Sequence, residues 1–280
     1  FNWSNPLKRA NLEKNDKNRA KQTSSGVSTT MGAANTTNLI VIPARMQATR
    51  LPGKPLKDIC GEPMIIHVWK RAMEADCGPV LVATDDHAVA DVITNNGGHA
   101  IMTSPDHASG SDRIFEAINK FDEAEKYKKI INLQGDLPVL DPDLVLNVAS
   151  LLADEQVDMS TLAVEIIDET EKTNPNVVKM VGAEMSADRQ RALYFTRATA
   201  PYGEGPLYHH IGIYGFQRQS LKRFISLPPS KLEIREKLEQ LRALEAGMRI
   251  DVAIVKTHPL GVDTQEDLEK ARQILGQKHT

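Results

Sequence analysis

From residue 39 onward, short apolar runs alternate with segments whose apolar residues recur at helical spacing. Strand-sized runs stand at 39–42, 80–83 and 130–133. Helices are predicted at 64–73, at 87–95 and from Ser111 onward. This strand–helix rhythm predicts an α/β fold, in which a mixed, mostly parallel sheet is sandwiched by helices.

After Asp158 the rhythm changes to strand-like segments with turn-rich joins. These segments are 159–164, 177–181, 192–195 and 211–216. They predict an antiparallel extension or an embedded subdomain. A further strand is predicted at 250–255.

Two helix starts carry a capping box near the C-terminal end of the chain. Ser230 is followed three residues later by Glu233, and Thr264 by Asp267. The first box predicts a helix that ends at Gly247. Its core side chains are predicted to be Ile234, Leu238, Leu241 and Leu244.

Composition narrows the classes of function. The chain has 280 residues, of which 41% are hydrophobic, enough for one catalytic domain at 39–280. A net charge of -3 and 5% aromatic residues argue against a nucleic-acid partner. No apolar run approaches the roughly 20 residues that span a membrane. Two cysteines, Cys60 and Cys77, are too few for a disulfide framework. Residues 1–38 resemble a disordered or tag-like extension, or a basic presequence.

The strongest chemical signal is the loop that follows the first strand. It places Arg45, Arg50 and Lys54 around a Pro-Gly turn, at the carboxyl edge of the predicted sheet. Such cations neutralise phosphate oxygens and stabilise a departing pyrophosphate, although a solvated basic loop has the same composition. A Walker A loop is disfavoured, because Pro55 follows Lys54 where that motif has Ser or Thr.

Two carboxylates follow predicted strands far apart in the chain. Asp136 comes after Gly135 at the exit of the third strand, and Asp263 precedes the last helix. Either alone is also typical of a turn or a helix N-terminus. Together they could hold one Mg²⁺ beside phosphate oxygens.

Seven motifs occur in a fixed order between residues 39 and 275. They are Arg50-Leu-Pro-Gly-Lys-Pro-Leu56 preceded by Arg45, Val82-Ala-Thr-Asp85, Ser109-Gly-Ser-Asp-Arg113, Gln134-Gly-Asp136, His210-Ile-Gly-Ile-Tyr-Gly215, Leu238-Glu-Gln-Leu-Arg242 and Gly261-Val-Asp-Thr264. In this order they resemble the 3-deoxy-manno-octulosonate (Kdo) cytidylyltransferases, the CMP-Kdo synthetases. The resemblance implies the fold of nucleotide-diphospho-sugar transferases and the reaction of CTP with Kdo to give CMP-Kdo and pyrophosphate.

The resemblance also implies roles for individual residues. Catalysis is expected of Arg45, Lys54 and Asp136, and Mg²⁺ is expected on Asp136 and Asp263. The expected nucleotide-binding residues are Arg45, Arg50, Lys54, Asp85, Ser109, Ser111, Arg113 and Gln134. The expected sugar-side residues are Arg197, His210, Glu239 and Gln240. Residues 189–227 are expected to form or support a homodimer contact, and the product is expected to feed lipopolysaccharide assembly in a bacterial cytoplasm.

Two positions depart from the family pattern. Leu137 stands where the family usually has Glu, and Ala48 where it often has Ser. Neither change removes a cation or carboxylate of the expected site. Two other hypotheses remain at this stage. One is a cytidylyltransferase for another sugar acid, such as a sialic or pseudaminic acid. The other is a catalytically silent nucleotide-binding protein of the same fold.

Overall fold

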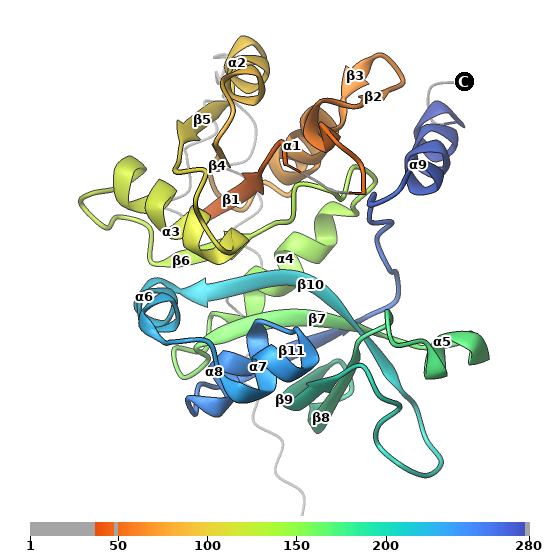
Figure 1. The fold of residues 1–280 in the computed structure, drawn as a ribbon. Helices are drawn as coiled ribbons and strands as arrows, with labels where there is room; N and C mark the ends of the chain where they lie inside the picture. Colours follow the sequence, from red (N-terminus) through yellow and green to blue (C-terminus); the bar gives the residue numbers. More distant parts are fainter. Residues whose placement is uncertain (1–36, 48–49, 278–280) are drawn as a thin grey trace, which may run out of the picture. The chain divides into compact units, whose positions relative to one another are not determined.

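The computed structural model describes residues 37–47 and 50–277, and in this part of the chain nine strands form one sheet (Figure 1). The strand order is β5-β4-β1-β6-β10-β7-β11-β9-β8. The strands are β1 (Asn38–Ala44), β4 (Val80–Thr84), β5 (His99–Met102), β6 (Lys129–Asn132), β7 (Met159–Glu165), β8 (Lys179–Ser186), β9 (Arg189–Thr196), β10 (Tyr208–Gln217) and β11 (Ile250–Val255). Only β9 and β10 run opposite to the other strands of this sheet, so the prediction of a mixed, mostly parallel α/β sheet is confirmed.

Helices pack on both faces of the sheet. They are α1 (Met64–Glu74), α2 (His87–Asn95), α3 (Gly110–Phe121), α4 (Pro142–Leu151), α5 (Glu169–Thr173), α6 (Arg218–Ser226), α7 (Lys231–Glu236), α8 (Gln240–Glu245) and α9 (Gln265–Gln277), with a short 3₁₀ helix η1 (Lys54–Leu56) and a small hairpin of β2 (Asp58–Ile59) and β3 (Glu62–Pro63). Side chains of α1, α2 and α4 share one apolar core, and those of α3, α6 and α8 share a second one.

Alternation along β1 explains these two cores. Successive side chains of a strand point to opposite faces of the sheet. Ile40 and Ile42 therefore join the core of α1 and α4, whereas Leu39 and Val41 join the core of α3. Since both faces are covered, the strand reads as a continuous apolar run, as its sequence predicted.

Strand β10 joins the two halves of the sheet. Its end pairs with β6 through Tyr214 and Asn132, and its beginning pairs with both β7 and β8. Because β10 pairs with β8 as well as with β7, the five strands β10, β7, β11, β9 and β8 form a closed ring of paired strands. The rhythm change after Asp158 corresponds to this closed half, which the sheet connects directly to the half formed by β1, β4, β5 and β6.

The prediction of a single helix between Ser230 and Gly247 is wrong in one respect. Its capping box is present, because Ser230 and Glu233 bond reciprocally. The helix breaks at Lys237, however, whose φ of 56° is left-handed, so two short helices replace one. As a result Ile234 is 65% exposed and not a core residue, whereas Leu241 is fully buried.

Some elements carried no sequence prediction. Helices α4 and α6 had not been assigned, although α4 begins with Asp141 as a helix cap and Pro142 at its first turn. Among the described residues no helix is long and apolar enough to cross a membrane. Cys60 and Cys77 form no disulfide with each other. Of the predicted extension at 1–38, residues 1–36 lie outside the described residues.

Candidate active site

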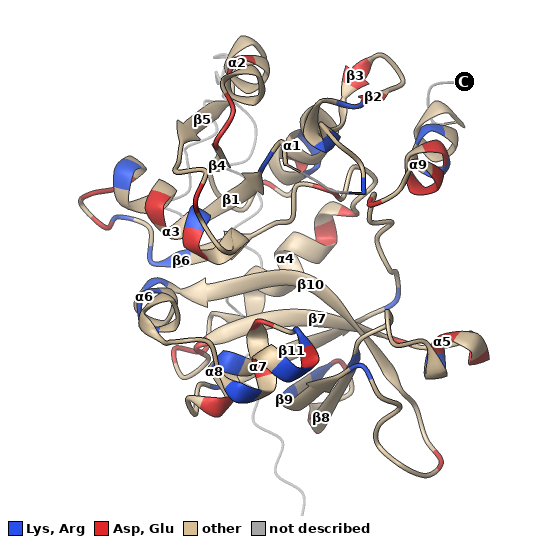
Figure 2. Cartoon of the chain, viewed as in Figure 1, with Lys and Arg blue, Asp and Glu red and all other residues tan. Residues whose placement is uncertain are grey.

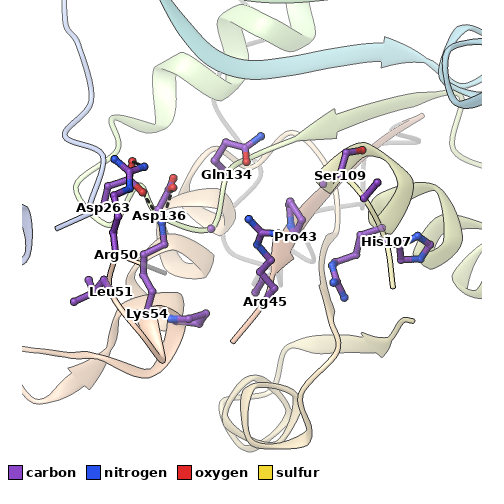
Figure 3. A pocket seen from close by; sticks show the side chains of 16 residues that line it. Pro43, Arg45, Arg50, Leu51, Lys54, His107, Ser109, Gln134, Asp136 and Asp263 are labelled. Carbon is purple, nitrogen blue, oxygen red and sulfur yellow. Dashed lines mark hydrogen bonds and ion pairs between the residues drawn. The ribbon is translucent and has the colours of Figure 1, made fainter. Parts of the chain in front are cut away.

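A cavity of about 300 Å³ opens at the carboxyl ends of β1 and β6 (Figure 3). Its walls come from the loop after β1, the start of α3, the exit of β6 and the segment before α9. The lining residues are Pro43, Ala44, Arg45, Arg50, Leu51, Lys54, Pro55, His107, Ala108, Ser109, Gly110, Arg113, Gln134, Gly135, Asp136 and Asp263. This is the edge where open α/β sheets bind ligands.

The cationic loop is held by a left-handed turn. Gly53 has a φ of 69°, and its N–H donates to the carbonyl of Met46 at 3.3 Å. The helix η1 follows with Pro55 in its first turn, while Leu51 is buried against α9. Because both flanks of the turn are anchored, Lys54 extends from a defined position into the cavity.

Backbone contacts bring Asp136, after the exit of β6, close to Asp263, in the segment before α9. A Cβ atom at Gly135 would lie 2.7 Å from the carbonyl oxygen of Pro43, so only glycine lets the exit of β6 approach β1 this closely. The carbonyl of Asp136 accepts the N–H of Val262 at 2.9 Å. The capping box between Thr264 and Asp267 begins α9 directly after Asp263 and confirms the sequence prediction.

Lys54 lies between the two carboxylates. Its Nζ is 2.9 Å from Oδ2 of Asp136 and 2.9 Å from Oδ1 of Asp263. Arg50 reaches the other oxygen of Asp263, with Nη2 at 2.9 Å from Oδ2. Burial alone would lower the pKa of Lys54, but the charges and hydrogen bonds of both aspartates outweigh it, so this pKa lies above its ordinary value. The predicted convergence of residues 54, 136 and 263 is therefore present.

The donor set fits a magnesium ion that substrate oxygens help to bind. No group of three or more His, Cys, Asp or Glu side chains in the described part of the chain could hold a metal by itself. Mg²⁺, however, often uses one or two carboxylates together with water and phosphate oxygens. Asp136 and Asp263 offer those two carboxylates at the cavity wall.

The opposite end of the cavity is formed around the start of α3. Figure 3 shows Arg50, Lys54, Asp136 and Asp263 gathered at one end and His107 and Ser109 at the other, with Pro43 and Arg45 between. Ser109 is the N-cap of α3, and its Oγ accepts the N–H of Asp112. Gln134 also lines this cavity.

Arg113 is neutralised at this end of the cavity. Its Nη2 donates to Oδ2 of Asp85 at 2.8 Å and its Nη1 to Oγ1 of Thr103 at 2.7 Å. Asp85 is not among the cavity-lining residues, so it contacts Arg113 from behind. Because the guanidinium has a carboxylate partner, this end suits an uncharged group better than a phosphate.

His107 is a cavity residue that the sequence prediction missed. Its Nε2 contacts Oε2 of Glu116, an oxygen that also accepts the N–H of Ser104 at 2.9 Å. The other oxygen of Glu116, Oε1, pairs with Lys120. Glu116 thus ties the loop before α3 to the helix itself. The only sequence signal was the position of His107, two residues before the Ser109 motif.

None of the four predicted sugar-side residues is among those that line the cavity, and two of them are bonded within the protein. Arg197 donates from Nε to the carbonyl of Glu236 at 2.8 Å and from Nη1 to that of Pro175 at 2.9 Å. His210 is buried, with Nε2 3.0 Å from Oγ1 of Thr161. Burial, with the neighbouring His209 and His258, lowers the pKa of His210 to about 3, so its imidazole is neutral near pH 7.

The other two sugar-side residues have unused polar atoms. Oε1 of Glu239 and Nε2 of Gln240 are buried and have no hydrogen-bond partner among the described residues. The second oxygen of Glu239 accepts from Ser111 at 3.0 Å, and Oε1 of Gln240 accepts from Tyr214 at 3.3 Å. Burial raises the pKa of Glu239.

Comparison with known proteins places this chain in a family. Residues 39–250 match the cytidylyltransferase family model. A 3-deoxy-manno-octulosonate cytidylyltransferase of Rhodopseudomonas palustris (strain TIE-1) is 61% identical over 238 residues, which is 85% of this chain and 97% of the relative. The enzyme of the same name from Mesorhizobium japonicum is 61% identical over 237 residues, covering 85% of this chain and 98% of the relative.

Solved structures agree with the sequence matches. A CMP:2-keto-3-deoxy-manno-octonic acid synthetase complexed with CTP superposes with a TM-score of 0.79 at 41% identity, covering 86% of this chain and 99% of that one. An apo UDP-glucose pyrophosphorylase, at 14% identity and a TM-score of 0.64, shares the fold, and it covers 87% of this chain and 99% of its own. The chain therefore belongs to the cytidylyltransferase family, among the 3-deoxy-manno-octulosonate cytidylyltransferases.

Proposed function

We propose that this protein transfers CMP from CTP to the anomeric hydroxyl of Kdo and releases pyrophosphate, giving CMP-Kdo for lipopolysaccharide biosynthesis. The observation that carries the proposal is the convergence of Lys54 with Asp136 and Asp263 at one end of the cavity. Relatives at about 60% identity bear the name of this activity. A nucleotidyl transfer needs such a site, because charge accumulates on the departing pyrophosphate.

The cations would bind the triphosphate. Arg45, Arg50 and Lys54 all line the cavity, and their positive charges offset the negative charge that develops as the bond to pyrophosphate breaks. The sugar hydroxyl would attack the α-phosphorus in line, so holding both substrates in the right orientation lowers the barrier. No covalent intermediate with the enzyme is needed.

Asp136 and Asp263 would hold Mg²⁺ as the cofactor. When bound, this ion would neutralise phosphate charge and lower the pKa of the attacking hydroxyl. The two carboxylates would act through their position. The backbone hydrogen bond from Val262 to Asp136 keeps Asp136 close to the segment that carries Asp263.

The neutral end of the cavity would receive the nucleoside. Ser109 and Gln134 offer a hydroxyl and an amide for the ribose and the cytosine. Arg113, paired with Asp85, would form the wall behind them. His107 lies at the same end and adds an imidazole to this proposed nucleoside subsite.

The sugar acid would lie toward α8. Glu239 and Gln240 have the unused polar atoms that sugar hydroxyls could satisfy, and Ser111 links them to α3. Arg197 and His210 would support this region from their bonded positions, since both use their nitrogens on protein oxygens.

The proposal extends to the assembly and the compartment of the protein. The segment 189–227, which includes β9, β10 and α6, would form or support a homodimer contact. We further propose that the enzyme works in the cytoplasm, with CTP and Kdo as its substrates and without nucleic acid or membrane partners.

A panel of sugar acids tests the proposed function. Purified protein is mixed with Mg²⁺ and CTP, and pyrophosphate release is measured with Kdo, a sialic acid or a pseudaminic acid. Release with Kdo alone is the expected result. Release with another acid alone would assign a different cytidylyltransferase, and no release with any acid would leave a silent nucleotide-binding protein.

A further inference from the structure

The carboxylates of the proposed metal site already have a cation between them. Lys54 Nζ lies 2.9 Å from Asp136 and 2.9 Å from Asp263, and the side chain of Lys54 is only 16% exposed. Arg50 continues the chain of charges by contacting the far oxygen of Asp263. Figure 2 shows basic positions of the loop after β1 close to acidic positions before α9.

A divalent cation and this ammonium group compete for the same oxygens. Mg²⁺ binds oxygen at about 2.0–2.1 Å. An ion that used Oδ2 of Asp136 and Oδ1 of Asp263 would need the two oxygens that Nζ of Lys54 contacts at 2.9 Å each. Two cations held this close repel each other, so each weakens the binding of the other to these oxygens.

We infer that Lys54 is an exchangeable internal counter-ion, which keeps a divalent cation off Asp136 and Asp263 until a triphosphate accepts the lysine. The inference rests on the proposed function, because the triphosphate supplies the new acceptors. The long, flexible stem of lysine permits such a change of partner. Lys54, Arg45 and Arg50 line one cavity, so phosphate oxygens that Arg45 and Arg50 bind would lie within its reach.

The exchange has two consequences for binding. Without nucleotide, a metal ion must displace the ammonium, which then loses both of its carboxylate partners. With nucleotide, the displaced ammonium gains phosphate oxygens, so metal and triphosphate strengthen each other's binding. Lys54 would thereby make the enzyme prefer the metal–nucleotide complex to either ligand alone.

The test measures metal binding without nucleotide. Mn²⁺ is titrated into the full-length protein, and free Mn²⁺ is followed by electron paramagnetic resonance. The Lys54→Gln variant should bind Mn²⁺ about tenfold more tightly than the wild type, or more, because the competing charge is gone. Adding Asp136→Asn to this variant should abolish the gain, which locates the ion at the strand tips.

A matched control removes one charge elsewhere. Lys70 pairs with the single carboxylate of Glu62 on the surface, and Lys70→Gln should leave Mn²⁺ affinity unchanged. A similar gain in both variants would mean that net charge alone is responsible, and this would overturn the inference. Equal or weaker Mn²⁺ binding by Lys54→Gln would overturn it as well.

Thermal unfolding supplies an independent readout. Lys54→Gln leaves two carboxylates without their shared cation, so its melting temperature should be lowered in a chelator and should rise with Mg²⁺ more than that of the wild type. An equal rise for both proteins would contradict the exchange. Neither measurement uses CTP or Kdo, so a failure here is distinct from a failure of wild-type pyrophosphate release, which would refute the proposed function.

Discussion

Ser111 donates a hydrogen bond of 3.0 Å from Oγ to Oε2 of Glu239, and this bond connects the start of α3 with the start of α8. Ser111 belongs to the helix whose N-cap lines the proposed nucleoside subsite. Glu239 has a second, unpartnered oxygen and is a proposed sugar ligand. The two proposed substrate regions are therefore joined by one hydrogen bond, whose donor Ser111 is buried.

Ser111→Ala should weaken the use of Kdo more than that of CTP. The variant leaves Oε2 of the partly buried Glu239 without this donor, at a cost of about 1–3 kcal/mol. The KM for Kdo is expected to rise at least several-fold, while the KM for CTP changes little. Steady-state kinetics with each substrate varied in turn would measure this.

The control for this variant is Ser220→Ala. Ser220 is also buried and donates to a carboxylate, Oδ1 of Asp158 at 2.6 Å, but it lies on α6 outside the cavity lining. This control should lose a similar amount of stability and keep both KM values. Equal effects of the two variants on the KM for Kdo would show that Ser111 acts through general stability.

Gly135→Ala should damage both stability and turnover. The added Cβ would lie 2.7 Å from the backbone oxygen of Pro43, which cannot rotate away. Overpacking of this kind costs about 1–3 kcal/mol, and relief by a shift of β6 would also move Asp136. Urea unfolding and pyrophosphate release check the two effects.

Gly212→Ala is the matched substitution for Gly135→Ala. Gly212 lies on β10, and a Cβ there meets nothing within 4 Å. Near-normal stability and turnover are expected of this variant. If Gly135→Ala behaved in the same way, the close approach of β6 to β1 would not be needed to position the carboxylate.

Glu116 should stabilise the loop of His107 in a pH-dependent way. Burial tends to raise its pKa, but Lys120, the Ser104 N–H and His107 lower it to about 2 from an ordinary 4.5. Because the folded pKa is the lower one, the unfolded chain binds more protons below pH 4.5, and the stabilisation disappears as pH falls toward 2. Solvent screening of this partly exposed group limits the effect to about 1 kcal/mol.

The corresponding measurement compares wild type with Glu116→Gln by urea unfolding at several pH values. The variant should be less stable at pH 7, and the difference should shrink as the pH is lowered below 4.5. Glu74→Gln, which breaks an exposed pair with Arg71, should show little difference at any pH. A difference between Glu116→Gln and wild type that stayed constant with pH would exclude this role of the charge.

The sequence carried the local signals of the fold and of the phosphate-binding end. Strand β1 could be predicted because its apolar run is continuous, and the capping boxes because their partners stand three residues apart. The site residues Lys54, Asp136 and Asp263 could be inferred together because all three belong to the ordered motifs that resemble the family. Their mutual 2.9 Å contacts needed the structure.

Backbone conformations and hydrogen bonds that depend on tertiary packing could not be predicted from the sequence. Lys237 adopts a left-handed conformation that helical periodicity does not signal, so the break between α7 and α8 was missed. Arg197 was expected near the sugar, but its bonds to Glu236 and Pro175 arise from the packing of β9 against neighbouring segments. The resemblance to the family placed such residues near the sugar without saying which atoms remain available.

Lys54→Ala should slow turnover by an amount that reflects lost charge at the pyrophosphate. Removing one such group costs about 2–4 kcal/mol of transition-state stabilisation. Single-turnover kinetics at saturating CTP and Kdo would measure it. A loss confined to Kdo affinity would contradict the placement of Lys54 at the phosphates.

The most direct test of the account is Asp136→Asn, assayed for CTP binding by calorimetry and for pyrophosphate release with CTP, Kdo and Mg²⁺. The account predicts that CTP still binds, because Arg45, Arg50 and Lys54 remain at the cavity, whereas turnover is abolished because the proposed metal site has lost one of its two carboxylates. Near-normal pyrophosphate release by this variant would contradict the claim that the two acidic strand tips and the cationic loop act as one catalytic site.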